Sequence, residues 1–249
     1  MDTRISDRCL TAEQRERCFR AAQIRRSVGA FCGTPSPDQL GVLAYIAEKT
    51  ELEGARLALF ECGDELFFSS VPDGRVIGCR NACAVIADRS VPSALLNAGF
   101  AGELFVLETV AQGLGACWVT NGVHRKRIPV SLNGNERIAA VIAFGETAET
   151  PEGPRKRRPL RELCRTDPSA WPLWAYNAAE CVRSAPSGWN LQPWRLAFAG
   201  NTLLLLRGMR PCPLDMGVAL LHLLLGVGDR SFSLTPGRDR EVACLIVEE

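Results

Sequence analysis

The order of its apolar segments repeats once along this chain, and that repeat constrains the fold more than any other feature. In the first half, a helical pattern is followed by an apolar hairpin pattern, a second helix and a strand, at residues 42–48, 56–68, 98–112 and 137–146. The same order returns at residues 171–180, 194–207, 215–228 and 241–248, and both hairpin patterns open on Arg-Leu-Ala. The period is too long for a solenoid, so we expect a duplicated unit whose two copies pack as a fused pseudo-dimer. The alternative is a chance likeness between two apolar hairpins.

Helix start signals and short apolar strands fill in the first half. Thr11 with Gln14, and Ser36 with Pro37 and Gln39, have the spacing of helix N-caps. Further strands are expected at residues 82–88 and 117–120. The predicted division is a first half at 1–150, a proline-containing basic connector at 151–168 and a shortened second half at 169–249.

Composition limits the possible partners and compartment. Residues 203–206 and 219–225 are the longest apolar runs in this reading, and both are far shorter than the roughly 18–20 residues needed to span a bilayer. The N-terminal residues 1–18 are charged and lack the apolar core of a secretory signal, so we expect a cytoplasmic protein. A formal charge of +1 gives no overall attraction to nucleic acid or to an anionic membrane. We therefore expect a small-molecule substrate, with neither nucleic acid nor membrane as partner.

The eleven cysteines are scattered singly, and none forms a Cys-x-x-Cys pair. We interpret them as reduced thiols that pack as small hydrophobic groups. Because the chain has only two histidines, we expect no metal site.

Two polar stretches are candidates for a ligand site. Residues 184–194, SAPSGWNLQPW, carry more hydrogen-bonding groups and flat aromatic surface than a connection between a helix and a strand requires. Arg25, Arg26 and Ser27 follow the first helix. They can serve as an ordinary helix C-terminus, or they can donate to a phosphate. Basic runs also occur at 124–127 and 155–158, and such runs are more often solvated surfaces than sites.

Four of these motifs together resemble the flavin-dependent nitroreductase family: RRSVGAF at 25–31, GLGACWV at 113–119, the strand AVIAFGE with the basic run RKRR at 155–158, and APSGWNLQPW at 185–194. The resemblance implies an α+β, nitroreductase-like FMN-binding fold with two pseudo-repeats, each a mainly antiparallel sheet flanked by helices. In most members the Pro-Ser-x-x-Asn loop closely follows the Arg-Arg-Ser stretch, whereas here it lies about 160 residues later. This late position resembles the branch in which one chain emulates the family dimer, which implies one complete flavin site and a chain that is active as a monomer.

The resemblance assigns residues to FMN as follows. The phosphate and the pyrimidine edge fall to Arg25, Arg26 and Ser27, with further charge from Lys156, Arg157 and Arg158. The resemblance places the backbone of Gly113, Leu114 and Gly115 near the reactive ring nitrogen. The residues of the second half that it assigns to the lining of the ring are Pro186, Ser187, Asn190 and Gln192. For the glycine pair, a helix C-cap is a compatible structural role.

The implied activity is the passage of electrons from NADH or NADPH, through the flavin, to a small electrophilic or aromatic acceptor. A flavin carries this chemistry itself, so we assign no catalytic side chain. A non-catalytic flavin-binding or flavin-sequestering protein is the alternative, and a purely structural protein with degenerate loops is a third. Trp189 suits ring stacking or core filling, His222 a buried structural role, and Asp215 a helix-terminal role.

Overall fold

The computed structural model describes residues 10–50, 52–68, 76–148, 155–237 and 241–247. It divides into two compact units: a central unit, residues 24–154, and a terminal unit, which combines residues 1–23 with 155–249. The terminal unit is therefore built from both ends of the chain. The linear boundaries expected at residues 150 and 168 stay a prediction.

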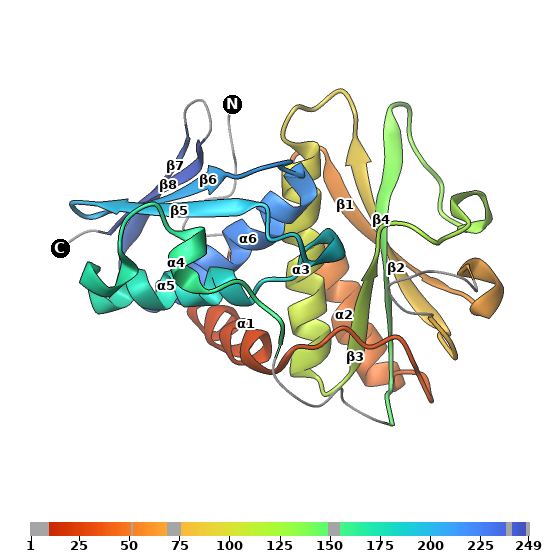
Figure 1. The fold of residues 1–249 in the computed structure, drawn as a ribbon. Coiled ribbons are helices and arrows are strands. Elements are labelled where there is room, and N and C mark those ends of the chain that lie inside the picture. The colour runs from red at the N-terminus through yellow and green to blue at the C-terminus, as the bar shows by residue number, and fades with distance from the viewer. Residues whose placement is uncertain (1–9, 51, 69–75, 149–154, 238–240, 248–249) are drawn as a thin grey trace. The chain divides into compact units, whose positions relative to one another are not determined.

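The central unit is a four-stranded antiparallel sheet with two helices on one face (Figure 1). Its strand order is β1-β2-β4-β3, and the strands are β1 (Ala55–Glu61), β2 (Asn81–Asp88), β3 (Gly115–Val119) and β4 (Glu136–Gly145). The helices are α2 (Pro37–Lys49) and α3 (Ala94–Ala111), and α3 packs against all four strands. Apolar residues of the opposite sheet face, among them Ile86 and Val141, pack under loops that contribute Phe31 and Phe67. Short 3-10 helices lie at Asp64–Leu66 (η1) and Arg125–Arg127 (η2).

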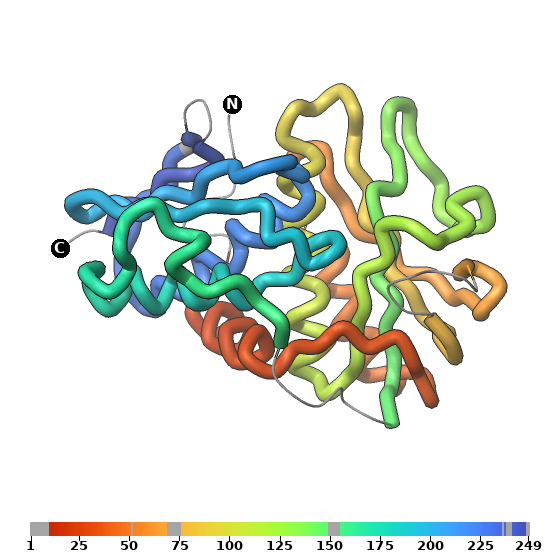
Figure 2. Tube along the Cα trace, in the orientation of Figure 1, coloured from red at the N-terminus to blue at the C-terminus, as the bar shows by residue number. Residues whose placement is uncertain are grey.

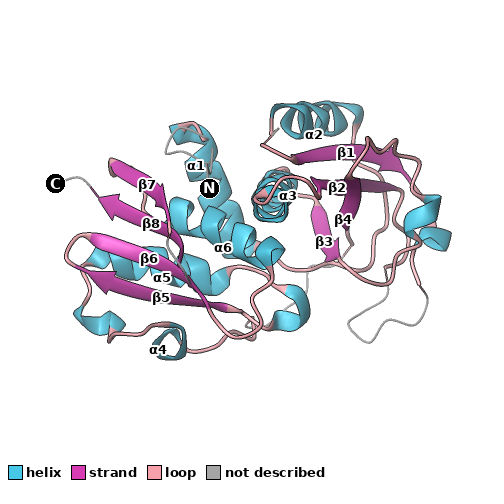
Figure 3. Ribbon diagram, turned by 90° about the horizontal axis from the view of Figure 1, so that it is seen from above, coloured by secondary structure: helices cyan, strands magenta, loops and turns pink. Residues whose placement is uncertain are grey.

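The terminal unit contains a second antiparallel sheet, with the order β5-β6-β8-β7 (Figure 3). Its strands are β5 (Trp194–Ala199), β6 (Thr202–Arg207), β7 (Phe232–Pro236) and β8 (Glu241–Val247). Its helices are α1 (Ala12–Ile24), α4 (Leu160–Leu163), α5 (Leu173–Ser184) and α6 (Pro213–Gly226), and α5 and α6 pack together. Two 3-10 helices, η3 (Pro168–Ala170) and η4 (Gly188–Asn190), lie in its loops.

Helix α1 is attached to the C-terminal part of the chain by two arginines. Arg15 Nη1 donates to the carbonyl of Gly228 at 3.0 Å, and its guanidinium lies 5.2 Å from the ring centre of Phe232. Arg155 donates to the last carbonyls of α1, those of Ala22 at 2.9 Å and Gln23 at 3.1 Å. A cation at a helix C-terminus satisfies carbonyls that have no partner within the helix.

The helix start signals are confirmed. Thr11 Oγ1 accepts from the Gln14 N–H at 3.2 Å. Ser36 and Gln39 make both bonds of a capping box, at 3.2 and 2.8 Å. The strands expected at 82–88, 117–120, 137–146 and 241–248 correspond to β2, β3, β4 and β8, and the hairpin expected at 194–207 is the pair β5 and β6.

The hairpin expected at 56–68 is wrong. Strand β1 pairs instead with β2, from Ala55 opposite Ala87 to Glu61 opposite Asn81. The Cys62 N–H continues that ladder by donating to the carbonyl of Arg80 at 3.0 Å. Residues after Gly63 form a 3-10 turn, in which Leu66 N–H donates to the Gly63 carbonyl, and so they do not return along β1. The counterpart of β6 in the central unit is therefore β2, which lies later in the chain.

The expectation that no segment reaches membrane-spanning length also needs correction. By length and composition alone, the 18-residue helix α3 could cross a bilayer, because its scattered glycines and single polar residues hid its apolar character. The helix is almost wholly buried against its sheet, as the core helix of a globular unit is, so this is weak evidence for a membrane span.

Candidate functional site

In the central unit, the structure brings two of the predicted stretches together. The segment after α1 runs parallel to the start of β3, with Ser27 bridged to Ala116 and the Val28 N–H donating to the Ala116 carbonyl at 3.1 Å. Gly115 permits this close approach, since a Cβ there would lie 3.2 Å from Val28 Cβ. Arg25, Arg26 and Ser27 therefore lie beside the segment 113–115.

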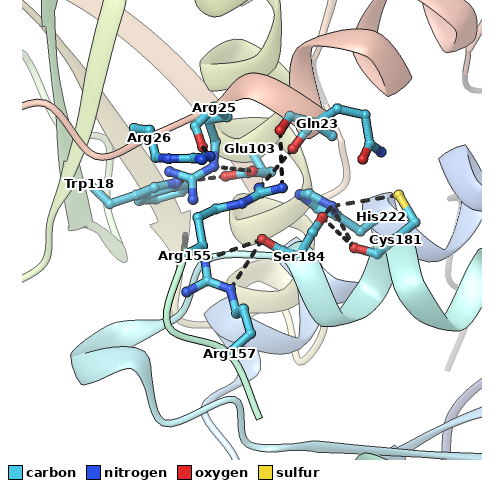
Figure 4. A network of polar contacts seen from close by, with 11 residues as sticks. Gln23, Arg25, Arg26, Glu103, Trp118, Arg155, Arg157, Cys181, Ser184 and His222 are labelled. Carbon is cyan, nitrogen blue, oxygen red and sulfur yellow. Dashed lines mark hydrogen bonds and ion pairs between the residues drawn. The ribbon is translucent and has the colours of Figure 1, made fainter. Parts of the chain in front are cut away.

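Arg25 is buried and paired with a carboxylate from α3 (Figure 4). Its Nε lies 3.9 Å from Oε1 of Glu103, which is fully buried, while Oε2 of Glu103 accepts from Trp118 Nε1 at 2.8 Å. Burial lowers the pKa of Arg25, and Glu103 partly offsets that effect. Within the part of the chain that the structure describes, Arg25 Nε makes no hydrogen bond, so a buried donor here lacks an acceptor.

Arg26 and Ser27 are more accessible than Arg25. The Arg26 side chain is half-buried, and its Nη1 donates to the carbonyl of Arg25 at 3.2 Å. Ser27 is exposed. These two residues present polar groups at the surface of the central unit, directly after the buried arginine.

The glycine segment forms the C-terminal cap of α3. Gly113 has a φ of +79°, and its N–H donates to the carbonyl of Val110 at 3.0 Å. The Leu114 N–H donates to Thr109 at 3.3 Å, and the Leu114 side chain is buried. The structural role anticipated for the glycine pair is thus confirmed at Gly113.

In the terminal unit, the basic connector and the loop 184–194 run side by side and are joined by hydrogen bonds (Figure 2). Arg157 donates to the Ser184 carbonyl at 3.2 Å and to Asn190 Oδ1 at 2.7 Å. Asn190 Nδ2 in turn donates to the Lys156 carbonyl at 2.9 Å. Arg157 and Asn190 therefore fix the connector to the loop.

Gln192 makes the second connection. Its Oε1 accepts from the backbone N–H of Arg158 at 2.9 Å, and its own N–H donates to Ser187 Oγ at 2.9 Å. Gln192 is 2% exposed, and both bonds are partly buried. Part of the polar excess that the sequence shows in this loop is thus used internally. Pro186 lies half-buried in the same loop.

Asp215, in the first turn of α6, holds the middle of the loop. Its Oδ1 accepts from the Gly188 N–H at 3.1 Å. Burial raises the pKa of Asp215 to about 6, and the Gly188 bond opposes that rise. The side chain therefore anchors a neighbouring loop from the first turn of α6, and the N-cap position of that helix is Cys212, which makes no side-chain cap bond.

Three residues of this loop have backbone conformations that side chains rarely adopt. Trp189, Asn190 and Gln192 have φ values of 53°, 53° and 48°. Trp189 is 58% exposed, which rules out the core-filling role. Strained residues of this kind persist where surrounding bonds over-determine them, and they concentrate at functional sites.

Two of the predicted cationic side chains remain uncommitted. Lys156 is exposed and Arg158 is half-buried, and neither side chain bonds or pairs with any residue that the structure describes. They are available to an anion, whereas Arg157 is occupied by the loop.

His222 is a buried structural residue, as expected. Its Nδ1 lies 3.1 Å from the Cys181 carbonyl and 3.4 Å from Ser184 Oγ, so it fixes the end of α5 where the loop begins. Figure 4 shows this contact with its neighbours in the terminal unit.

Sequence reasoning missed the contributions of Glu103 and Trp118. The apolar pattern 98–112 contains two carboxylates, Glu103 and Glu108, and a carboxylate within such a pattern is a signal for a buried polar contact. The partner is not visible in the sequence, because Arg25 and Glu103 are far apart along the chain.

A family model described as "Putative TM nitroreductase" matches residues 20–227. The chain belongs to this nitroreductase family. The match covers the arginine–serine segment, the glycine segment of β3, the connector and the loop 184–194.

Among solved structures, a nitroreductase-family protein from Thermotoga maritima, described as a putative nitroreductase, is similar over nearly the whole chain. It is 26% identical, with a TM-score of 0.68, and the similarity covers 93% of this chain and 94% of that one. The nitroreductase fold is therefore shared by both sheets of the present protein.

Two more distant structures cover about half of this chain. An FMN-dependent nitroreductase from Clostridium difficile is 15% identical with a TM-score of 0.46, over 54% of this chain and 90% of its own. A protein from Bacteroides thetaiotaomicron, described as a putative NADH dehydrogenase/NAD(P)H nitroreductase, is 18% identical with a TM-score of 0.46, over 58% and 94%. No curated protein sequence matches this chain.

Proposed function

We propose that this protein is an FMN-dependent oxidoreductase, which passes electrons from NADH or NADPH to a small electrophilic or aromatic acceptor. The observation that carries the proposal is the junction of Arg25–Ser27 with β3, where the Nε–H of a buried arginine makes no hydrogen bond among the described residues, beside the glycine segment 113–115. Family membership agrees with that chemistry.

The residues fit the phosphate of FMN. Anion binding requires hydrogen-bond donors that are fixed in place. In the central unit these are the Arg25 Nε–H, the Arg26 guanidinium and the Ser27 hydroxyl; in the terminal unit they are the uncommitted Lys156 and Arg158 side chains. We propose all five as phosphate ligands. Gly113, Leu114, Gly115, Pro186, Ser187, Asn190 and Gln192 are proposed to face the ring.

Each of these residues has a distinct task. Glu103, itself held by Trp118, orients the Arg25 guanidinium. Arg157 and Asn190 hold the connector so that the neighbouring Lys156 and Arg158 present their charges from a fixed backbone. Bound FMN would supply the hydride chemistry, and the chain supplies binding, orientation and charge.

We further propose that the two halves of one chain correspond to the two subunits of the family dimer. Both sheets have the same strand order, and both have a register shift in the second strand, between Val85 and Ile86 in β2 and between Leu205 and Leu206 in β6. A duplicated unit explains both features. We expect one FMN per chain and a monomer in sedimentation velocity; two FMN per chain would contradict this proposal.

Flavin reduction tests the activity. The purified protein, reconstituted with FMN, should show flavin absorbance that is bleached by NADH or NADPH under anaerobic conditions and restored by a nitroaromatic acceptor. If the protein binds flavin but neither NADH nor NADPH bleaches it, the protein is a non-catalytic flavin-binding protein and the proposed activity is wrong. Failure to bind FMN at all would overturn both functions.

Arginine variants test the assigned ligands. Arg26→Ala should weaken FMN binding by about 1.5–3 kcal/mol, the range for a hydrogen bond to a charged group, and Arg158→Ala should have a comparable effect. Fluorescence titration measures both affinities. The controls are Arg137→Ala, which removes another half-buried arginine of the central unit, and Arg161→Ala, which removes an exposed arginine of α4 within the connector. If all four variants bind FMN with equal affinity, then Arg26 and Arg158 are not phosphate ligands.

A further inference from the structure

Two cysteines of the central unit lie side by side outside the proposed flavin site. Cys62 follows β1 and Cys79 precedes β2, and their sulfur atoms are 3.8 Å apart. The β1–β2 ladder produces this contact, because the Cys62 N–H continues it by donating to the Arg80 carbonyl at 3.0 Å. A disulfide bond has a length of about 2.05 Å, so the sulfurs need to approach by less than 2 Å.

Cys62 is accessible to a small oxidant, whereas Cys79 is not. Cys79 is fully buried, and Cys62 is half-buried at the wall of a cavity of about 100 Å³. A water molecule needs about 10–15 Å³ of such space, so hydrogen peroxide fits easily. The other residues that line the cavity are Phe60, Glu61, Glu65, Leu66, Arg127 and Pro129.

The two thiols share a hydrogen bond. Cys62 Sγ donates to Cys79 Sγ, which raises the pKa of Cys62 and lowers the pKa of Cys79. Glu65 and Asp64 raise the pKa of Cys62 further. When the pair loses one proton, the negative charge therefore lies on Cys79 and is stabilised by the S–H group of Cys62. The remaining proton can move from the Cys62 sulfur to the Cys79 sulfur along this hydrogen bond.

We propose that Cys62 and Cys79 are a redox-sensitive pair, which hydrogen peroxide converts to an intramolecular disulfide that a thiol reductant reverses. Cys62 first passes its proton to the Cys79 thiolate; the Cys62 thiolate then attacks one peroxide oxygen, the S–O bond forms, the O–O bond breaks, and the leaving hydroxide takes up a proton from the solvent to become water. The Cys79 thiol then attacks the Cys62 sulfur, the S–S bond forms, and the S–O bond breaks with release of a second water. In sum, two thiols lose two electrons and two protons, and one hydrogen peroxide becomes two waters.

The bridge would join β1 to a segment that borders the proposed phosphate ligands. Ile77, two residues before Cys79, donates its N–H to the Gly29 carbonyl and accepts from the Phe31 N–H, both at 2.9 Å. Residues 29–31 directly follow Arg25, Arg26 and Ser27. Oxidation at the pair therefore crosslinks the strand to the backbone that continues from those ligands.

Peptide mapping of the full chain tests the pair directly. The reduced protein is treated with hydrogen peroxide, its remaining thiols are alkylated in denaturant, and it is digested with trypsin without reductant. Trypsin cuts after Arg56, Arg75 and Arg80, so Cys62 and Cys79 fall in separate peptides, 57–75 and 76–80. We expect these two peptides to be linked, the free thiols to fall from eleven to nine, and dithiothreitol to restore all eleven.

Single variants identify the order of the two steps. Cys79→Ser should leave Cys62 as a sulfenic acid that dimedone traps, and Cys62→Ser should leave Cys79 unoxidised because it is buried. Cys32→Ser, which removes an exposed cysteine, should leave the crosslink unchanged. The mapping of the unaltered chain decides the matter even if a variant fails to fold: oxidation at other cysteines without the 57–75 to 76–80 crosslink would overturn the proposal.

Discussion

The loop that leads from a helix into the first strand of the sheet is built differently in the two units. It spans residues 50–54 in the central unit and 185–193 in the terminal unit. In both units, the loop backbone is held by a buried polar side chain from the core helix that follows later in the chain, α3 or α6. This polar residue lies two positions before a glycine of the same helix. Asn97 donates to the Glu53 carbonyl at 2.9 Å, and Asp215 accepts from the Gly188 N–H at 3.1 Å.

The difference between these loops lies in which residues take the left-handed backbone conformation. In the short loop it is Gly54, with a φ of +70°, which has no side chain to strain. In the long loop it is Trp189, Asn190 and Gln192; asparagine tolerates this conformation, whereas Trp189 and Gln192 each cost about 1–2 kcal/mol there. The long loop retains side chains at a cost that glycine would avoid, and this indicates that the side chains themselves are needed.

The largest expected effect concerns the buried carboxylate of Glu103 in α3, compared with the partly exposed carboxylate of Glu180 in α5. Removal of the α3 carboxylate by Glu103→Ala leaves Arg25 buried without its counter-charge, so we expect a loss of about 3–5 kcal/mol in the free energy of unfolding. Urea unfolding measures this loss. In the terminal unit, Glu180→Ala breaks a pair with Arg183 that is about one-third exposed, and it should cost no more than about 1 kcal/mol. Similar losses in the two variants would mean that burial does not distinguish these ion pairs.

The α6 carboxylate should instead make stability depend on pH. Because burial raises the pKa of Asp215 to about 6, from an ordinary 3.8, the folded state holds a proton that the unfolded state releases. Stability should therefore fall as pH rises from about 4 to 6, by at most about 3 kcal/mol. Asp215→Asn should remove this dependence, as measured by urea unfolding at several pH values. Asp38→Asn, an exposed position in the first turn of α2, is the control and should leave it intact.

The smallest expected effects on stability come from substituting one residue in each loop, with glycine removed from the short loop and introduced into the long loop. Gly54→Ala imposes a left-handed alanine whose Cβ would lie 2.6 Å from Val91 Cβ, so we expect a loss of about 1–3 kcal/mol. Trp189→Gly relieves strain but adds the entropy cost of glycine, so stability should change by less than about 1 kcal/mol. Thermal unfolding compares them. A large loss from Trp189→Gly would show that the tryptophan packs for stability rather than for a ligand.

Local signals in the sequence predicted most of the helices and strands. The capping residues Thr11 and Ser36 and the β5–β6 hairpin depend on neighbours within a few positions, which is why they could be read directly. The pairing of β1 with β2 could not, because the competing partner at 65–68 is equally apolar and closer in sequence. Strand β7 (Phe232–Pro236) was missed although its first four residues alternate apolar and polar, because the run is short and ends in a proline.

The candidate site was predictable where residues gather along the chain. Arg25–Ser27 and residues 184–194 were found as motifs, but what each side chain binds depends on distant contacts. Arg157 and Asn190 bind each other across 33 positions, and Asp215 reaches Gly188 across 27. Sequence alone could therefore name these polar groups without showing that several of them hold the loop itself.

The placement of α1 affects how the chain can fold during synthesis. Its partners Arg155, Gly228 and Phe232 are made much later, while residues 24–154 form a compact unit in between. The central unit can therefore fold on the ribosome first, and α1 must wait with Cys18, Ala21 and Ala22 uncovered until the C-terminal segment emerges. A ribosome-bound chain truncated before residue 213 should accordingly protect the central unit from protease and leave α1 open to cleavage.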